Sequence, residues 1–441
     1  MAEVENKNEL FIQEYECGEK MNTYRLNHEQ KSMHLSTMKN KSNTSLTSLF
    51  RAFFYPDNYP LGVSSDYGIF QFYNILQTGC IAISGALAFS ALFRGMGVGQ
   101  NASNYLAASI VWLLKDGAGM IGRIIFAWGF AASFDANCKR WHFLGDILND
   151  VACILDLITP YFQSALLIIS SLSNICRAIT GVIHGSTRTV IFQHQARNNN
   201  VADITAKCSS LETMVSLIAL FVNVVLLSML PSTFIWPIFL TLTGGHLWAN
   251  YKAKRCILFN IFNHQRFHLV CSEYFRTNGK HTLSIEQVND QEPILFRTSI
   301  PYHSHLGISL SHLPDKIFPS QSQLEKFHFD DYERFLILYD KSVNTFYVLL
   351  RPNSDTDDII RLNFFIEILS YAMRSIKKEN SNEEFDSLIN RLQKQLPNLD
   401  LCLSILHEDN DRCYEQFKQV CLEQGYNFQR CLFNIDIYRI Q

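Results

Sequence analysis

The chain has 441 residues, of which 38 are basic and 41 acidic, so its formal net charge is -3. This balance excludes a basic nucleic-acid-binding surface and a strongly acidic tail. Residues 52–251 carry 9 acidic and 9 basic side chains, 18 of 200 or 9%, whereas the other 241 residues carry the remaining 61, about 25%. The second value is ordinary for a soluble protein. The sequence therefore predicts two chemically different parts, which the average charge of the whole chain conceals.

The first 48 residues are expected to form a flexible N-terminal segment. The first 20 residues contain glutamates where a signal peptide has basic and apolar residues, so no cleavable targeting segment is predicted. Residues 31–49 are rich in serine and threonine, basic, and without clear periodicity.

The 12 cysteines are scattered along the chain, and no two form a C-x-x-C pair. That spacing gives no indication of a zinc or redox motif. We expect reduced thiols in a compartment that resembles the cytosol.

Three uncharged stretches in residues 49–252 are long enough to cross a bilayer. The stretch Tyr73–Leu92 has 20 residues, and Leu157–Cys176 has another 20, although Pro160 should shorten or kink the second helix. The longest uncharged stretch, Thr213–Tyr251, has room for one crossing over Thr213–Leu230 and then a short return helix or re-entrant segment. We therefore expect a helical core embedded in a lipid bilayer.

A large soluble helical bundle with apolar core helices is the alternative for this region, because two of the stretches are rich in Ser, Gly and Ala. The basic residues Lys252, Lys254 and Arg255 follow the last apolar stretch directly. Basic clusters at the end of a span usually face the cytosol, so the C-terminal domain is expected to be cytosolic. The sequence does not indicate which organelle holds the membrane.

Residues 253–441 are predicted to form a smaller soluble α+β domain. Residues 252–276 indicate a basic amphipathic helix that continues the preceding one, and residues 334–340 and 345–351 indicate a β-hairpin. Helices are predicted after an Asp cluster at 355–358 and near 382–395 and 412–424, and a closing strand over 428–440. The Asp cluster lacks the glycine and the downstream glutamate of an EF-hand, so helix capping is its expected role. This domain is the expected contact for a protein partner or homologue.

The residues 117–122 spell G-x-G-x-x-G, with Asp135 18 residues after Gly117. This pattern resembles a dinucleotide-binding fingerprint. However, the surrounding sequence lacks the alternation of strands and helices that such a site requires, and close packing between helices is the favoured role of these glycines. A nucleotide-dependent enzyme remains an alternative.

Several polar residues lie in otherwise apolar stretches. Asp146 and Asp150 share one helix face, and buried carboxylates need a cation, a metal or a bound polar group. Salt bridges to Arg123 or Arg177 would also satisfy them. The segment 193–213 is dense in amide and charged groups, which suits either a solvated loop or a hydrogen-bonding site. The candidate ligand-binding residues are Asp116, Arg123, Asp146, Asn149, Asp150, His194, Gln195, Arg197, Asn199, Asp203 and Lys207.

No serine, cysteine or histidine arrangement identifies a catalytic nucleophile. The pairs His264/His268 and His303/His305 have no carboxylate or cysteine at metal-ligand spacing. We therefore expect no catalytic residues, no metal site and no cofactor, and a protein that is not an enzyme.

The chain resembles the root UV-B sensitive (RUS) family at several separated motifs covering about 200 residues. These are FYPDNYPLGVSSDY (54–67), GMGVG (95–99), WLLKDGAGMIGRIIFAW (112–128), LNDVA (148–152), STRTVIFQHQARNNNVADITAKCSSLET (186–213) and ANYKAKRCILFNIFN (249–263). The resemblance implies a membrane protein and supplies no reaction and no catalytic residue. Its plant relatives are tied to light and UV-B responses, but nothing in this sequence indicates a plastid address.

Three functional hypotheses follow from the sequence. The leading one is a non-enzymatic membrane protein that binds or moves a small polar or lipid ligand at a polar site around Arg123, Asp146, Asp150, His194 and Arg197. The second is a soluble or peripheral helical scaffold in which the same groups form only structural ion pairs. The third is a nucleotide-dependent enzyme that uses the glycine motif.

Overall fold

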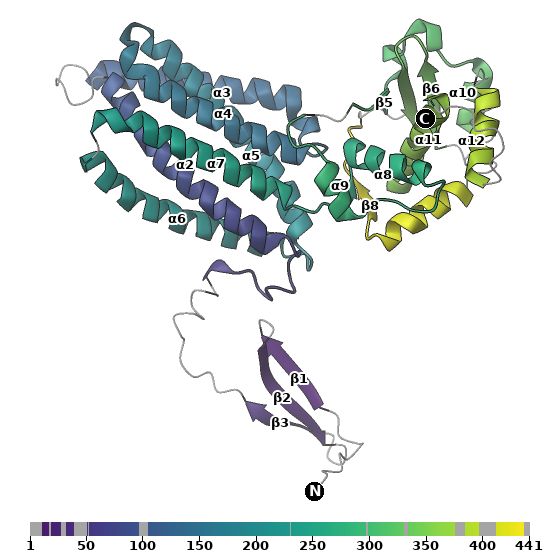
Figure 1. Cartoon of the computed structure of the whole chain (residues 1–441), viewed down its shortest axis with the longest axis horizontal. Helices are drawn as coiled ribbons and strands as arrows, with labels where there is room; N and C mark the ends of the chain where they lie inside the picture. The colour runs from purple at the N-terminus through teal and green to yellow at the C-terminus, as the bar shows by residue number, and fades with distance from the viewer. Residues whose placement is uncertain are drawn as a thin grey trace. The chain divides into compact units, whose positions relative to one another are not determined.

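The computed structural model describes residues 11–16, 19–27, 32–38, 51, 53–96, 105–229, 231–296, 299–329, 334–374, 384–396 and 412–435. The chain divides into two compact units. The first, here called the helical unit, comprises Met1–Gly129 and His142–Ile257, and the second, the C-terminal unit, comprises Phe130–Trp141 and Leu258–Gln441. Figure 1 shows the helices and strands of each unit.

A three-stranded antiparallel sheet lies in the N-terminal segment that we expected to be flexible. Its strands, in the order β1-β2-β3, are β1 (Phe11–Glu16), β2 (Glu19–Asn27) and β3 (Ser32–Met38). Aromatic and β-branched residues such as Phe11, Ile12 and Tyr24 favour extended backbone. The expected flexibility rested instead on the charged and hydroxyl residues around them. Residues 1–10 and 39–50 of the same segment lie outside the described part.

Six long helices make up most of the described part of the helical unit, which also includes strands β1, β2 and β3. The helices are α2 (Tyr67–Gly95), α3 (Tyr105–Phe130), α4 (Cys138–Ile158), α5 (Leu166–Gln195), α6 (Val201–Met229) and α7 (Ile235–Arg255). Helix α2 packs against both α7 and α6. The chain thus has the mostly helical fold predicted from its apolar stretches.

Pro160 separates two helices, as its position predicted. Helix α4 ends at Ile158, the 3-10 turn Thr159–Tyr161 follows, and α5 begins at Leu166. The apolar stretch after Pro231 forms a regular helix, α7, of 21 residues, because Pro237 lies in its first turn, where proline needs no hydrogen-bonded N–H. It is therefore longer than the short return helix that we expected.

The glycine motif lies within helix α3 and serves helix packing. A Cβ atom at Gly119 would clash with the Asn174 side chain of α5, and one at Gly122 would lie 2.9 Å from a methyl carbon of Ile175. Asn174 donates a hydrogen bond to the backbone carbonyl of Lys115. The absence of side chains at these two glycines therefore lets α3 and α5 approach closely, as predicted.

The C-terminal unit combines two small sheets with helices. Strands β5 (His303–Leu306), β7 (Thr345–Leu350) and β6 (Phe335–Asp340) form one sheet in that order, and β4 (Ile261–Phe262) pairs with β8 (Asn427–Cys431). Its helices are α8 (His264–Arg276), α9 (Ile285–Gln291), α10 (Gln321–Phe329), α11 (Thr356–Arg374), α12 (Glu384–Gln395) and the helical residues 412–423. A core rich in buried aromatic side chains joins α8, α11 and α12 to the sheets.

Most elements expected in this unit are present. Strands β6 and β7 form the antiparallel hairpin, and α11 and α12 match their predicted helices. Asp355 and Asp358 each accept a hydrogen bond from the other's backbone N–H, which confirms the capping role of the Asp cluster. The closing strand is described over Asn427–Cys431, and residues 436–441 lie outside the described part.

The expected helix over 252–276 is wrong in its middle. Helix α7 ends at Arg255, strand β4 follows, and Asn263 caps α8 by accepting a hydrogen bond from the backbone N–H of Arg266. An Asn at this position favours a helix start over a helix interior. The apolar pattern therefore belongs to two elements rather than one.

A buried ionic cluster connects residues 130–141 to the rest of the C-terminal unit. Lys139 lies 3.1 Å from a carboxylate oxygen of Glu292 and also donates a hydrogen bond to Asn289. Asn263 donates to the Ala136 carbonyl and to Glu292. Burial alone would raise the pKa of the Glu292 carboxyl, but Lys139 and Arg266 outweigh that effect and lower the pKa to about 2.

Substitutions in the glycine motif should distinguish the effect of helix packing on stability from the effect of helix propensity. Gly119→Ala displaces Asn174 and is expected to lower the free energy of unfolding by about 1–3 kcal/mol, because overpacking forces side chains out of place. Gly117 has open space around it, so Gly117→Ala is the matched control and should raise stability by up to about 1 kcal/mol. Thermal unfolding of the purified variants measures both. Equal effects of the two changes would contradict the packing role.

The Glu292 carboxylate should make stability depend on acid pH. Its pKa in the folded protein lies below the ordinary value of 4.5, so its contribution is complete above that pH and is lost as the pH falls toward 2. The loss is on the order of 3 kcal/mol. Glu292→Gln should be less stable at neutral pH, with a difference that shrinks over this range. The exposed Glu415→Gln is the control, and an unchanged pH profile in Glu292→Gln would contradict the assignment.

Candidate functional site

Five ionisable side chains of the helical unit come together between α4, α5 and α7. We call them the His–Asp cluster: His142, Asp146 and Asp150 on α4, His184 on α5 and His246 on α7. The two aspartates are about 5% or less exposed, and His246 is 2% exposed. The predicted common helix face of Asp146 and Asp150 is thus directed toward buried neighbours.

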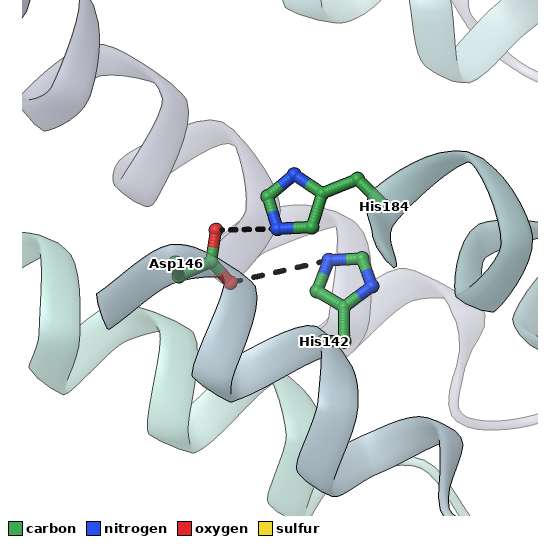
Figure 2. Close-up of side chains that lie close together, drawn as sticks. All are labelled: His142, Asp146 and His184. Carbon is green, nitrogen blue, oxygen red and sulfur yellow. Dashed lines mark ion pairs between the residues drawn. The ribbon is translucent and has the colours of Figure 1, made fainter. Parts of the chain in front are cut away.

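The Asp146 carboxylate lies at the centre of the His–Asp cluster. One oxygen is 3.1 Å from Nε2 of His184 and 3.9 Å from Nε2 of His246, and the other oxygen is 4.0 Å from Nε2 of His142. The rings of His142 and His184 stack with their centroids 4.5 Å apart. Figure 2 shows both rings turned toward the carboxylate.

Asp150 and Thr187 fix the rings from outside this centre. Nδ1 of His246 lies 2.9 Å from a carboxylate oxygen of Asp150, and Nδ1 of His142 lies 2.9 Å from the hydroxyl oxygen of Thr187. Each ring therefore has its Nδ1 engaged and its Nε2 directed toward Asp146.

The close approach of α4 and α5 depends on a glycine. A Cβ at Gly145 would lie 3.0 Å from Nε2 of His184 and 3.1 Å from a methyl carbon of Ile183. The hydroxyl of Thr180 donates to the Gly145 carbonyl and ties the helices together. His184 can contact Asp146 because the position next to Asp146 carries no side chain.

The two aspartates of α4 contact histidines rather than the arginines considered from the sequence. Arg177 instead forms an ion pair with the fully buried Asp156. Arg123 has an exposed side chain on α3, and Asn149 is partly buried on α4.

Asp116, on α3, is partly exposed. It accepts a hydrogen bond from Asn174 and lies 4.0 Å from Lys115. The residue therefore belongs to the contact between α3 and α5.

The polar segment that begins at residue 193 packs against the segment before α2. His194 lies 3.0 Å from a carboxylate oxygen of Asp66, and the Gln195 carbonyl accepts a hydrogen bond from the backbone N–H of Ser64. The backbone N–H of Arg197 donates to the Gly62 carbonyl. This segment is thus a hydrogen-bonded junction rather than a plain solvated loop.

The remaining candidate residues extend this junction. Asp203 accepts a hydrogen bond from the backbone N–H of Asp57. Asn199 is exposed with a φ of 55°, a left-handed conformation that asparagine tolerates in turns, and Lys207 is partly buried. Apart from Arg123 and Asn149, the sequence-predicted residues thus lie in three places: the α3–α5 contact, the His–Asp cluster and the junction at residues 193–207.

Sequence reasoning missed the histidines of the cluster and Asp66. His142 could have been found, because it precedes Asp146 by four residues and so shares its helix face. His184 and His246 lie 38 and 100 residues after Asp146, and their approach is set by helix packing, which no local spacing encodes.

The glycine motif has the wrong surroundings for a dinucleotide site. Such a site needs a strand, a tight turn and then a helix N-terminus that faces the pyrophosphate. Residues 105–130 form one continuous helix here, so the backbone N–H groups of the motif lie inside helical turns. This geometry gives no support to the nucleotide-dependent alternative.

The fold and the His–Asp cluster define a mostly helical protein in which apolar helices surround a buried polar centre. Residues 40–278 match the family model described as "Vitamin B6 photo-protection and homoeostasis domain", and residues 281–441 match "Root UVB sensitive protein, C-terminal". The chain belongs to the root UVB sensitive family, as the sequence motifs implied.

Two relatives illustrate the similarity. RUS family member 1 of Dictyostelium discoideum is 34% identical over 278 residues, 62% of this chain and 52% of the relative. Protein root UVB sensitive 3 of Arabidopsis thaliana is 33% identical over 295 residues, 64% of this chain and 66% of the relative. The chain thus spans about half to two thirds of the length of these relatives. No solved structure matches this chain.

Asp66 should stabilise the folded protein through its contact with the junction at residues 193–207. The Asp66 side chain is 2% exposed and contacts His194 and the Ser64 hydroxyl. Asp66→Ala leaves both partners without it, with an expected loss of about 3–5 kcal/mol in unfolding free energy. The exposed Arg197→Ala keeps its backbone hydrogen bond and should change stability by less than about 0.5 kcal/mol. Thermal unfolding followed by circular dichroism measures both, and equal losses would contradict this ranking.

Proposed function

We propose that this chain is a non-enzymatic membrane protein whose helical unit binds or moves a small polar ligand, or the polar group of a lipid, at the His–Asp cluster. One observation carries the proposal: ionisable side chains are buried among helices whose outer side chains are apolar and exposed. Charged groups inside a weakly charged helical body are costly and commonly mark a ligand or ion path.

The exposed apolar side chains support the membrane part of the proposal. Trp128 is 90% exposed and Met229 is 77% exposed. Soluble monomers rarely expose large contiguous apolar surfaces. On α6 alone the large exposed apolar residues are Leu217, Ile218, Leu220, Phe221, Val222, Val224, Val225, Leu227 and Met229.

Helix length supports it as well. Tyr67–Gly95, Gln163–Gln195 and Val201–Met229 are long and apolar enough to cross a membrane. A helix of 29 residues is about 43 Å long, more than the hydrocarbon core of about 30 Å. Only 17% of the most apolar window in Val201–Met229 is buried, which leaves most of that helix for contact with lipid.

The basic residues at the end of α7 support a cytosolic C-terminal unit. Lys252 is exposed and Arg255 is partly exposed, whereas Lys254 is fully buried. The positive-inside rule relies on such flanking basic residues. We extend the proposal to this orientation, and to a protein partner for the C-terminal unit.

The soluble or peripheral scaffold remains the competing function. It requires the exposed apolar side chains of α3 and α6 to be covered by protein rather than lipid. It also assigns the His–Asp cluster to structural ion pairs alone. Behaviour in membrane extraction distinguishes the two.

Carbonate extraction of cell membranes tests the proposal. The tagged chain should stay in the membrane pellet after alkaline washing, because several apolar helices hold it in the bilayer. Phe221→Arg places a charge on the exposed face of α6, at the middle of its uncharged part, and costs about 2.5–3.5 kcal/mol near the bilayer centre, so retention should fall. Ser209→Arg, exposed nearer the polar start of α6, is the matched control and should be retained.

Release of the unmodified chain into the soluble fraction would reject the membrane function and favour the scaffold. In sealed membranes that have not been washed with carbonate, a protease added from the cytosolic side should remove a C-terminal tag. Protection of that tag would reject the proposed orientation and leave the membrane function standing.

A further inference from the structure

Three side chains of the His–Asp cluster have the geometry of a metal site. His142 and Asp146 are one turn apart on α4, and His184 faces them from α5 (Figure 2). The nearest ligand atom of each lies within 4.8 Å of the others, so one ion between them could contact all three. His142 and Asp146 are buried, and His184 is partly exposed.

Hydrogen bonds fix His142 with its Nε2 lone pair toward this point. The Thr187 hydroxyl donates its hydrogen to the Ile183 carbonyl at 2.7 Å. The same hydroxyl oxygen lies 2.9 Å from Nδ1 of His142, so it must accept the ring's Nδ1–H. In the neutral ring, Nε2 then carries no hydrogen and presents a lone pair to Asp146.

The atoms that face one another here lack hydrogen bonds. The Asp146 oxygen nearest His142 is buried and has no hydrogen-bond partner among the described residues. Nε2 of His184 lies 3.1 Å from the other Asp146 oxygen. Nε2 of His142 and the Asp146 oxygen nearest it are thus two buried acceptors that face each other 4.0 Å apart, and a cation between them would stabilise both. The buried Lys254 also acts electrostatically on the two groups.

A second layer of contacts has the pattern found around bound metals. Ligand imidazoles commonly donate their other N–H to a carboxylate or other acceptor, which fixes the ring and its tautomer. His142 has this contact with Thr187. His246, beside the three, has a similar contact with Asp150.

We propose that His142, Asp146 and His184 bind a divalent first-row transition-metal ion, with zinc or ferrous iron as the best match. Two imidazole nitrogens and one carboxylate suit these ions, whereas calcium and magnesium prefer oxygen ligands throughout. Three protein ligands leave coordination positions open for water or another ligand. The inference deepens the proposed function, on which it rests, because it names the ligand class of the His–Asp cluster.

Cobalt binding to the purified full chain tests the inference. The chain is purified in detergent, treated with a chelator and titrated with Co²⁺, whose visible absorption reports nitrogen and oxygen ligands. We expect saturation at one ion per chain, displacement by Zn²⁺ and a metal-dependent rise in the unfolding temperature. Absence of the absorption band, or a band that saturates without raising that temperature, overturns the inference.

Variants test whether His142, Asp146 and His184 are the residues that bind the ion. Asp146→Asn and His184→Gln should weaken binding at least tenfold. Wild-type affinity in Asp146→Asn or His184→Gln overturns the inference. If either variant fails to fold, Gly145→Val is the second test, because its added methyls displace His184, and undiminished binding there overturns the inference too.

Two control variants match these changes. His268→Gln alters a buried histidine that lies 2.9 Å from Glu367 in the C-terminal unit, and Gly185→Ala alters a glycine of α5 with open space around it. Both should bind Co²⁺ like the wild type. A chain that stays in the membrane pellet but binds no metal rejects the metal inference alone, whereas a soluble chain that binds metal rejects only the membrane function.

Discussion

The burial of charged side chains in a weakly charged helical body is the constraint on which the helical unit depends. A carboxylate removed from water must find a cation, hydrogen-bond donors or a bound group, or it destabilises the fold. Asp156 meets this need with Arg177, and Asp66 meets it with His194. Asp146 has histidines on two sides, and one of its oxygens accepts no hydrogen bond within the described part of the chain. Asp156 also has one oxygen without a hydrogen bond in the described part of the chain, and the buried Lys254 acts electrostatically on Asp146. The two aspartates therefore differ in their nearest partners, which are imidazoles at Asp146 and a guanidinium at Asp156.

Small residues make these pairings possible, because they set how closely the helices approach. Gly119 and Gly122 bring α3 against α5, and Gly145 brings α4 against the same helix. Helix α5 is therefore held on two faces by neighbours that lack side chains at the contact. The position of His184 follows from this packing rather than from any local hydrogen bond to its own helix. Close helix contact through small residues is typical of helices in membranes, where burial of apolar surface drives association less than it does in water.

Much of the fold could be predicted from the sequence because it follows local rules. Uncharged stretches predicted helices α2, α5 and α6, Pro160 predicted that α5 would be shortened, and the Asp355–Asp358 pair predicted the start of α11. The prediction was wrong where one apolar pattern runs through two elements, as in residues 252–276, where Asn263 caps the start of a new helix. Only part of the candidate site could be predicted from the sequence. Asp146 and Asp150 share a face by periodicity, but His184 and His246 reach them through tertiary packing, which spacing along the chain does not contain.

Buried carboxylates are compensated by different groups in the two units, and this difference bears on function. In the C-terminal unit, Glu292 is surrounded by Lys139, Arg266 and Asn263, so the carboxylate is fully compensated and its pKa is low. Such a cluster fixes structure and has no need of a ligand. Around Asp146 the nearest partners are imidazoles, whose charge depends on protonation and whose lone pairs can bind a metal. The metal site that we propose rests on this difference, because a neutral imidazole has a lone pair for a cation, whereas the ammonium and guanidinium groups around Glu292 have none.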